Sequence, residues 1–443
     1  MAHSGNSAAE LARRIESKEA VVAILGLGYV GLPLAVSFAR AGFKTHCFDS
    51  DRRKVAAINA GRRYIRHIPA SDVRAIGESG GRASASLKDL PSADAVVIAV
   101  PTPLTPQREP DISHIIEAAV AVASTLRPGQ LVSLESTTYP GTTREVLLPF
   151  LARSGLKPGR DFFLAYSPER EDPARAGHSA RDLPKVVGGL TRRCLDLASL
   201  LYGKIVPEVV PVSSPEAAEA AKLTENIFRF VNIGLVNELK TVFDRMGVDI
   251  WEVVEAAKTK PFGYMPFYPG PGLGGHCIPI DPYYLLWKAR EYGRTARFIE
   301  LAGEVNAAMP DRVLRRTAEE LNRERKSLNG SRILLVGVAY KNDIDDVRES
   351  PGLKLLDMFE AGGARVDYHD PHVPRLAGRG ADGKGMKSVV LRASALAEYD
   401  AVVVTVAHSK VNYRMLGESA RLIVDTKNAM AGVDAVRARV VKA

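Results

Sequence analysis

The chain has 443 residues, enough for two or three domains, and its apolar content of 46% and charged content of 25% are ordinary for a soluble globular protein. Its net charge of +9 comes from dispersed basic residues, so we expect no nucleic-acid partner. No apolar run approaches the roughly 20 residues of a membrane span, and the polar first residues do not resemble a signal peptide. Three unclustered cysteines indicate a reducing cytoplasm, without a disulfide framework or a metal site.

A dinucleotide-binding unit is predicted near the start of the chain. The apolar run 20–25 is typical of a buried parallel strand and leads into GLGYVG at 26–31, then into a helical pattern. A second strand follows at 44–48 and ends at Asp49. Strand, glycine turn, helix, strand and acid stand in the order that dinucleotide binding requires.

Each glycine of this turn has a physical role. Gly26 allows the tight turn, Gly28 lets the backbone approach a pyrophosphate, and Gly31 lets the helix pack closely on the strand. Asp49 can accept a hydrogen bond from a ribose hydroxyl, which favours NAD over NADP, although Arg52 nearby weakens that exclusion. The alternative is a glycine-rich turn in an ordinary α/β unit. The expected cofactor contacts are Gly26, Gly28, Tyr29, Val30, Gly31, Asp49, Arg52, Thr102 and Thr137.

Polar residues follow three further predicted strands. These strands are at 95–100, 130–135 and 162–166. Thr102 follows the first strand, at the carboxyl edge where ligands bind in such sheets. Thr137 follows the second, where capping of a helix from Thr142 is an equally good interpretation. Glu169 follows the third, where it can act as a general base or pair with Arg170.

The longest helical pattern covers 213–246 and ends at a glycine. Lys222, Asn226 and Arg229 are spaced to lie on one face of this helix. Such a stripe is usually a solvated face. It can also line a site for an anionic, oxygen-rich substrate.

A loop rich in glycine and proline, FYPGPGLGGHCIPIDPYY at 267–284, surrounds Cys277. Helical patterns flank it at 250–259 and 296–309. Asp281 and Pro282 are typical of an N-cap and a first helical residue, so Cys277 comes just before a helix start. Backbone donors at such a position favour a thiolate and thus a nucleophile. The alternative is a small buried apolar residue.

The last part of the chain repeats the strand, turn, helix and strand order at low similarity. Strands are predicted at 332–338, 365–368, 401–406 and 422–425, with a helix at 351–360. The turn after the first of these strands is longer and charged, GVAYKNDIDDVRESP. It suits a nucleoside diphosphate, with Lys341 and Arg348 on the phosphates or sugar. The alternative is a surface loop of mixed charge.

Seven motifs, in order, make the chain resemble the UDP-glucose/GDP-mannose dehydrogenase family over nearly its whole length. They are GLGYVGLPLA at 26–35, VPTP at 100–103, EST at 135–137, SPER at 167–170, KLTENIFR at 222–229, GPGLGGHCIPIDP at 270–282 and AYKNDIDDVRESP at 339–351. The resemblance implies an α/β protein with two Rossmann-like doubly wound domains joined by a central helical dimerisation segment. The expected domains are 1–212 for NAD, 213–325 for the helices and the cysteine loop, and 326–443 for a UDP-sugar. A homodimer or higher homo-oligomer is expected.

The family implies two oxidations at C6 of a UDP-sugar, with two NAD used per product and no aldehyde released. The resemblance assigns Cys277 as the nucleophile that attacks the aldehyde, so that a thiohemiacetal and then a thioester form. Lys222 and Asn226 would stabilise the oxyanion.

Hydrolysis of the thioester needs an activated water. Asp281, together with Thr137 and Glu169, would position and activate it, and this role of Asp281 is compatible with capping the helix. The expected substrate contacts are Glu169, Arg170, Lys222, Asn226, Arg229, Gly274, His276, Lys341 and Arg348.

The residues around the thiol indicate the substrate. UDP-glucose enzymes of the family usually have GFGGSCFPKD, whereas this chain has GLGGHCIPID. His276 and Ile280, in place of serine and lysine, resemble the branch that acts on UDP-N-acetylhexosamines, because a neutral site suits an acetamido group. We expect UDP-N-acetyl-D-glucosamine, oxidised for a surface polysaccharide. The mannosamine and galactosamine epimers and then UDP-glucose are alternatives, and a non-catalytic NAD or nucleotide-sugar sensor is the alternative from another class.

Overall fold

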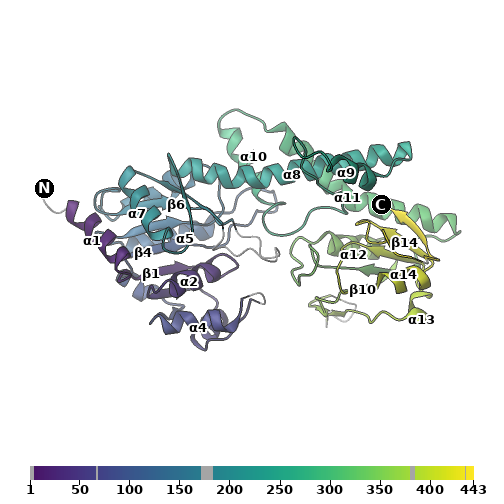
Figure 1. Cartoon of the computed structure of the whole chain (residues 1–443), viewed down its shortest axis with the longest axis horizontal. Helices are drawn as coiled ribbons and strands as arrows, with labels where there is room; N and C mark the ends of the chain where they lie inside the picture. Colours follow the sequence, from purple (N-terminus) through teal and green to yellow (C-terminus); the bar gives the residue numbers. More distant parts are fainter. Residues whose placement is uncertain (1–3, 66–67, 171–182, 380–384, 435) are drawn as a thin grey trace. The chain divides into compact units, whose positions relative to one another are not determined.

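The computed structural model describes residues 4–65, 68–170, 183–379, 385–434 and 436–443 (Figure 1). The chain divides into two compact units. The first consists of Met1–Glu225 and Tyr283–Arg294, and the second of Asn226–Pro282 and Thr295–Ala443. Each unit contains one large, mainly parallel sheet with helices, which confirms the predicted α/β class.

The first unit is built on an eight-stranded sheet. Its strands are β1 (Val22–Leu25), β2 (Thr45–Phe48), β3 (Ala83–Ser84), β4 (Ala95–Ile98), β5 (Leu131–Leu134), β6 (Phe163–Tyr166), β7 (Lys185–Gly189) and β8 (Val209–Val212). Their order is β3-β2-β1-β4-β5-β6-β7-β8, and neighbours are parallel except for β6 and β7. The order reverses between β1 and β4, and ligands bind at such a reversal, outside the carboxyl ends of the strands.

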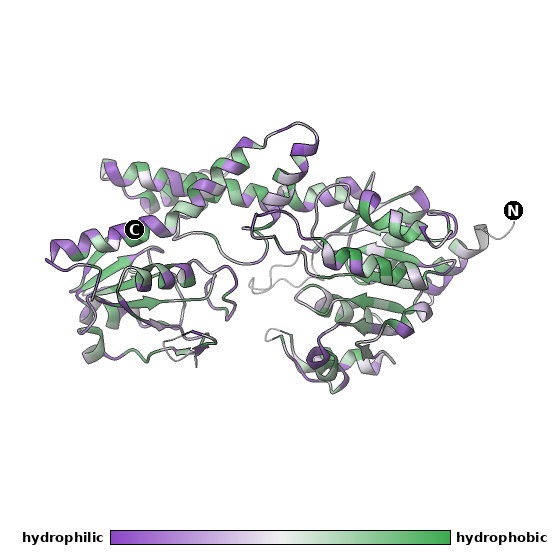
Figure 2. Ribbon diagram, turned by 180° about the vertical axis from the view of Figure 1, so that it is seen from behind, coloured by the Kyte–Doolittle hydropathy of each residue, from purple (hydrophilic) through white to green (hydrophobic). Residues whose placement is uncertain are grey.

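Helices surround this sheet. They are α1 (Ser4–Glu16), α2 (Gly31–Arg40), α3 (Arg52–Asn59), α4 (Ala70–Glu78), α5 (Ser113–Thr125), α6 (Leu148–Ala152) and α7 (Arg192–Tyr202). Val22 and Ile24 of β1 belong to one buried cluster, and Ala23 and Leu25 belong to another. Because successive residues of a strand point to opposite faces, both faces of the sheet are covered. Figure 2 shows the strands of both sheets as mainly hydrophobic.

The second unit holds a five-stranded parallel sheet. Its order is β10 (Arg365–His369), β9 (Arg332–Val336), β13 (Ala401–Val404), β14 (Leu422–Asp425) and β15 (Arg439–Lys442). A short hairpin, β11 (Arg375–Leu376) and β12 (Met386–Lys387), lies outside it. The helices that follow these strands are α12 (Pro351–Ala361), α13 (Ala393–Leu396) and α14 (Tyr413–Ser419).

Four further helices come between the two sheets in the sequence. They are α8 (Pro215–Met246), α9 (Ile250–Ala257), α10 (Asp281–Glu291) and α11 (Arg297–Arg323). The division between the units falls within α8 and within α10. None of the helices in the described part of the chain combines the length and the apolar character needed to cross a bilayer.

The helix α11 is longer than the sequence predicts. It does not end at Met309 but continues through Pro310 to Arg323. A proline inside a helix removes one hydrogen bond and costs about 3 kcal/mol. Val313 and Leu321, beyond the proline, are fully buried in the cluster that covers the five-stranded sheet. Burying two such side chains contributes about 3–6 kcal/mol, which offsets the cost.

Candidate active site

The glycine turn between β1 and α2 has the shape that a dinucleotide needs. A Cβ atom on Gly26 would lie 2.4 Å from the carbonyl oxygen of Ala99, and one on Gly31 would lie 1.8 Å from the carbonyl oxygen of Gly26. A Cβ atom on Gly28 would meet nothing within 4 Å. Two glycines are therefore required by packing, while Gly28 faces open space, as the close approach of a pyrophosphate to the backbone requires.

Asp49 lies against this turn. Its carboxylate accepts hydrogen bonds from the backbone N–H of Leu27 at 2.8 Å and from Lys54 Nζ at 2.9 Å. Arg52 is the exposed first residue of α3. The contact with Leu27 ties the acid to the glycine loop, where a ribose hydroxyl is expected to meet it. Tyr29, at the start of α2, is exposed, and Val30 is half-buried.

The predicted polar residues do follow β4, β5 and β6. Thr102 is buried, and its carbonyl oxygen accepts a hydrogen bond from the Tyr284 hydroxyl at 3.0 Å. Thr137 is half-buried after β5. Glu169 Oε1 accepts from the N–H of Arg170, and Arg170 forms an ion pair with Glu225 of α8 at 2.7 Å. The expected substrate contact Arg170 thus has an acidic partner within the first unit.

A buried ion pair, which the sequence did not reveal, supports this sheet edge. Lys185 Nζ lies 2.8 Å from Glu135 Oε2, and both side chains are buried. Burial raises the pKa of Glu135, while Lys185 opposes that rise. Glu135 stands two residues before Thr137, so the pair fixes the backbone that presents this threonine. In the sequence, the only sign of this ion pair was a glutamate at the end of an apolar run. Its partner Lys185 begins β7, a strand that was not predicted.

The helix α8 carries the Lys222, Asn226 and Arg229 stripe as expected. Lys222 belongs to the first unit, and Asn226 and Arg229 belong to the second. Arg229 donates to Asn226 Oδ1, and Asn226 Nδ2 donates to the buried carboxylate of Asp281. Because a guanidinium only donates, it fixes the orientation of the amide. One N–H of Nδ2 is then used by Asp281.

Cys277 is exposed at the start of the turn that leads into α10. Its carbonyl oxygen accepts hydrogen bonds from the N–H groups of Ile280 at 3.1 Å and Asp281 at 2.9 Å. A helical turn therefore joins the thiol residue to Asp281, and the helix begins at Asp281, one residue earlier than predicted. Residues four apart in a helical turn share one face, so Cys277 and Asp281 are neighbours.

Within the second unit, the cysteine loop packs on the charged loop that follows β9. The N–H of Gly275 donates to the carbonyl oxygen of Arg348 at 3.1 Å. A Cβ atom on Gly274 would lie 2.6 Å from Cβ of Tyr340 and 2.9 Å from the carbonyl oxygen of Glu349. Only glycine fits there, so the predicted substrate residue Gly274 has a packing role as well.

The surroundings of His276 disfavour its protonated form. Burial lowers the pKa of His276, and the nearby Arg348 lowers it further. Arg348 is exposed and makes two-point contact with Asp346, while Lys341 is half-buried in the same loop. Lys427, which was not predicted, has its Nζ 3.2 Å from the Cβ position of Gly270. Its pKa is lowered by burial.

The expected catalytic residues divide between the two units. Asn226, Cys277 and Asp281 belong to the second unit, where the hydrogen bond from Asn226 joins α8 to α10. Lys222, Thr137 and Glu169 belong to the first unit, together with the glycine turn.

A glycine turn at the strand-order reversal of a parallel sheet is typical of a dinucleotide-binding enzyme, and the similarity to known proteins makes the class an NAD-dependent nucleotide-sugar dehydrogenase. The chain belongs to the UDP-glucose/GDP-mannose dehydrogenase family. Its NAD binding domain matches residues 20–206, its central domain matches 216–308, and its UDP binding domain matches 334–432.

Relatives of this chain differ in their substrates. It is 34% identical to UDP-N-acetyl-D-glucosamine 6-dehydrogenase of Pseudomonas aeruginosa, over 93% of this chain and 97% of that protein. It is 35% identical to NDP-N-acetyl-D-galactosaminuronic acid dehydrogenase of Ralstonia nicotianae, over 94% and 97%. A solved structure of UDP-D-ManNAc dehydrogenase from Pyrococcus horikoshii matches with a TM-score of 0.84 and 31% identity, over 95% of this chain and 99% of that one.

Proposed function

We propose that the chain oxidises C6 of UDP-N-acetyl-D-glucosamine twice, to the uronic acid, with covalent capture of the aldehyde by Cys277. The observation that carries this proposal is the exposed Cys277, joined by one helical turn to Asp281, whose carboxylate Asn226 holds. A nucleophile, an oxyanion donor and a base are the groups that thioester chemistry needs.

The expected catalytic residues have complementary roles. Cys277 attacks the aldehyde carbon and keeps the reactive intermediate bound. The second N–H of Asn226 Nδ2, with Lys222, donates to the oxyanion that develops. Asp281, with Thr137 and Glu169, accepts a proton from the water that hydrolyses the thioester. Bound NAD⁺ supplies the hydride acceptor for each oxidation, and the glycine turn with Asp49, Arg52 and Thr102 holds it.

The choice of substrate rests on the residues beside the thiol. His276, whose pKa is lowered, is neutral at pH 7, and Ile280 is uncharged. A neutral pair at these positions favours an acetamido group over a bare hydroxyl. The relatives named for N-acetylhexosamines have similar identities to this chain, which supports the class of sugar. The UDP part is assigned to Arg229, Lys341 and Arg348.

A panel of UDP-sugars tests the substrate. With NAD⁺ present, we expect NADH formation with UDP-N-acetyl-D-glucosamine to exceed that with UDP-glucose by at least about a hundredfold in kcat/KM, since loss of a matched polar contact costs a few kcal/mol. NADH absorbance measures the rate, and the panel includes the mannosamine and galactosamine epimers. Faster turnover of either epimer would reject the glucosamine assignment and keep the reaction.

The domain bounds 1–212, 213–325 and 326–443 remain part of this proposal, and the three family matches fall within them. The cytoplasmic location also remains a prediction, based on the three unclustered cysteines of the sequence.

We also propose that the chain forms a homodimer through α8. Exposed apolar side chains recur along this helix at spacings of three, four and seven residues: Phe228, Leu235, Leu239, Val242 and Met246. A stripe of this kind on one helix is typical of a surface that packs against a second helix. Phe298 and Leu301 of α11 are exposed as well.

Changing Leu235 and Leu239 to glutamate together is expected to give a monomer, because charge cannot be buried in the helix contact. Light scattering after size exclusion measures the mass, which should fall from twice 47.9 kDa to that value. Val120→Glu, an equally exposed apolar position on α5, is the matched control. An unchanged mass in the double variant would place the contact elsewhere.

A further inference from the structure

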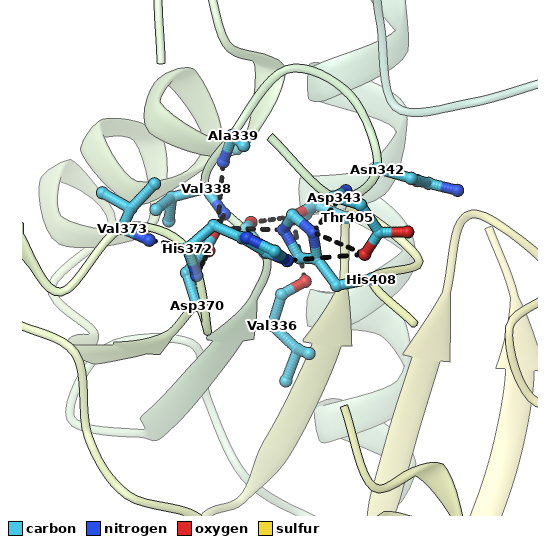
Figure 3. Close-up of polar contacts among 12 residues, drawn as sticks. Val336, Val338, Ala339, Asn342, Asp343, Asp370, His372, Val373, Thr405 and His408 are labelled. Atoms are coloured by element: carbon cyan, nitrogen blue, oxygen red, sulfur yellow. Dashed lines mark hydrogen bonds and ion pairs between the residues drawn. The ribbon is translucent and has the colours of Figure 1, made fainter. Parts of the chain in front are cut away.

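Three side chains capable of binding a metal meet at the carboxyl edge of the five-stranded sheet (Figure 3). Asp343 lies in the loop after β9, His372 follows β10, and His408 follows β13. These three strands are adjacent and parallel in the order β10-β9-β13. The fold therefore brings together residues that are far apart in sequence.

Their spacing is close to that of a tetrahedral metal site. His372 Nε2 lies 3.4 Å from Asp343 Oδ1, and His408 Nδ1 lies 3.9 Å from the same oxygen. All three ligand atoms lie within 4.8 Å of one another. Ligands at about 2.0 Å from a tetrahedral zinc ion are roughly 3.3 Å apart, so the atoms need to move inward by about 1 Å or less.

His372 lacks a hydrogen bond at the nitrogen that faces this centre. Its side chain is only 10% exposed, and its Nε2 atom is buried without a hydrogen-bond partner among the described residues. A buried polar atom without a hydrogen bond lowers the stability of a fold by about 1–3 kcal/mol. Most buried polar groups therefore have a hydrogen-bond partner. A metal ion would supply the missing partner.

The second contact of His408 prepares its other nitrogen for a metal. His408 Nε2 donates to Asp370 Oδ2 at 3.0 Å, and both side chains are fully buried. Asp370 also accepts from the backbone N–H groups of Val338, Ala339, His372 and Val373. A carboxylate behind a histidine fixes the tautomer and is the usual support of a metal ligand. The lone pair is then on Nδ1, on the side of Asp343.

One existing contact has to open. His408 Nδ1 accepts the backbone N–H of Asp343 at 2.9 Å. The Asp343 carboxylate also accepts from the N–H and hydroxyl of Ser409 and is partly exposed. A small rotation of Asp343 would move its backbone N–H away from the His408 imidazole and bring its carboxylate closer.

We propose that Asp343, His372 and His408 bind a divalent transition-metal ion of the zinc type, with a fourth position open to water. Two imidazoles and one carboxylate suit Zn²⁺, Co²⁺ or Ni²⁺ and not Mg²⁺ or Ca²⁺, which prefer oxygen. The sequence predicted no metal site because its cysteines are few and unclustered. That prediction applies to sites with thiolate ligands, whereas this site has histidine and aspartate ligands. The ion would join the loop after β9 to β10 and β13. The proposal does not depend on the identity of the sugar.

Titration with Co²⁺ tests the site directly, because a four-coordinate Co²⁺ absorbs visible light. The full chain carries no histidine tag and has Cys277→Ser, so that the exposed thiol cannot bind the ion. After removal of metals with a chelator, we expect one Co²⁺ per chain, displaced by Zn²⁺. His372→Ala and Asp343→Asn should each weaken binding at least about tenfold. His114→Ala, an exposed histidine on α5, should leave it unchanged.

Because Asp343 is partly exposed, we expect the Asp343→Asn chain to fold normally. It therefore tests the site independently of His372→Ala, which replaces a mostly buried side chain. Thermal unfolding of the full chain serves as the check that the fold of each variant is intact. Absence of Co²⁺ absorption in the parent chain, or equal Co²⁺ affinity in an intact Asp343→Asn chain, would overturn the proposal.

Discussion

Replacing Cys277 by serine is expected to lower the rate of uronic acid formation by about a thousandfold or more, because a serine hydroxyl is a far weaker nucleophile at neutral pH. Cys277 is exposed and stands one helical turn before Asp281, so the change removes the attacking atom and leaves the loop intact. Binding of NAD⁺ and of the nucleotide sugar should change by less than about threefold, since neither depends on the sulfur.

NADH absorbance gives the rate, and calorimetry with each ligand gives the affinities. Cys47→Ala is the matched control, because this thiol is fully buried in β2 and burial raises its pKa to about 12. The control should retain nearly full activity. A serine variant at 277 that forms the acid at the normal rate would remove the thiol from the mechanism.

The second large effect is expected at the glycine turn. A Cβ atom on Gly31 would lie 1.8 Å from the carbonyl oxygen of Gly26, so Gly31→Ala forces α2 away from β1. Overpacking against rigid backbone costs about 3 kcal/mol or more, and we expect NAD⁺ binding to be lost. Gly28→Ala has open space at Cβ and should keep its stability, while its NAD⁺ affinity falls at least about tenfold.

Thermal unfolding and NAD⁺ titration of both variants separate packing from cofactor contact. Two different outcomes are expected: Gly31→Ala loses stability, and Gly28→Ala loses only NAD⁺ affinity. Equal melting temperatures for the wild type and Gly31→Ala would show that the close approach of α2 is not needed. An unaltered affinity in Gly28→Ala would place the pyrophosphate elsewhere.

Much of the fold could be predicted from local pattern. The buried runs that form β1 and β4 are continuous and apolar, as parallel strands covered on both faces must be. The short strands β7 and β8 were missed. β7 begins with Lys185, whose charge is paired with Glu135, just after β5 and 50 positions earlier in the sequence, and β8 is only partly buried and contains Pro211. These features depend on tertiary contacts, which a local pattern does not contain.

The sequence predicted individual residues of the candidate site but not the contacts between them. The spacing of Asn226 and Arg229 placed them on one face of a helix, and the loop composition singled out Cys277. The hydrogen bond from Asn226 to Asp281 joins residues 55 positions apart, so no local pattern could indicate it. The same is true of Asp343 and His408, which meet only because β9 and β13 are neighbours.

The most direct test of covalent catalysis is the mass of the protein during turnover. The Asp281→Asn chain, in which release of the acid is expected to be slow, is mixed with NAD⁺ and UDP-N-acetyl-D-glucosamine and stopped with acid. We predict an added mass equal to the substrate less the hydrogens removed in both oxidations, located by peptide mapping on Cys277. Accumulated uronic acid or free aldehyde, with unmodified Cys277, would contradict the account.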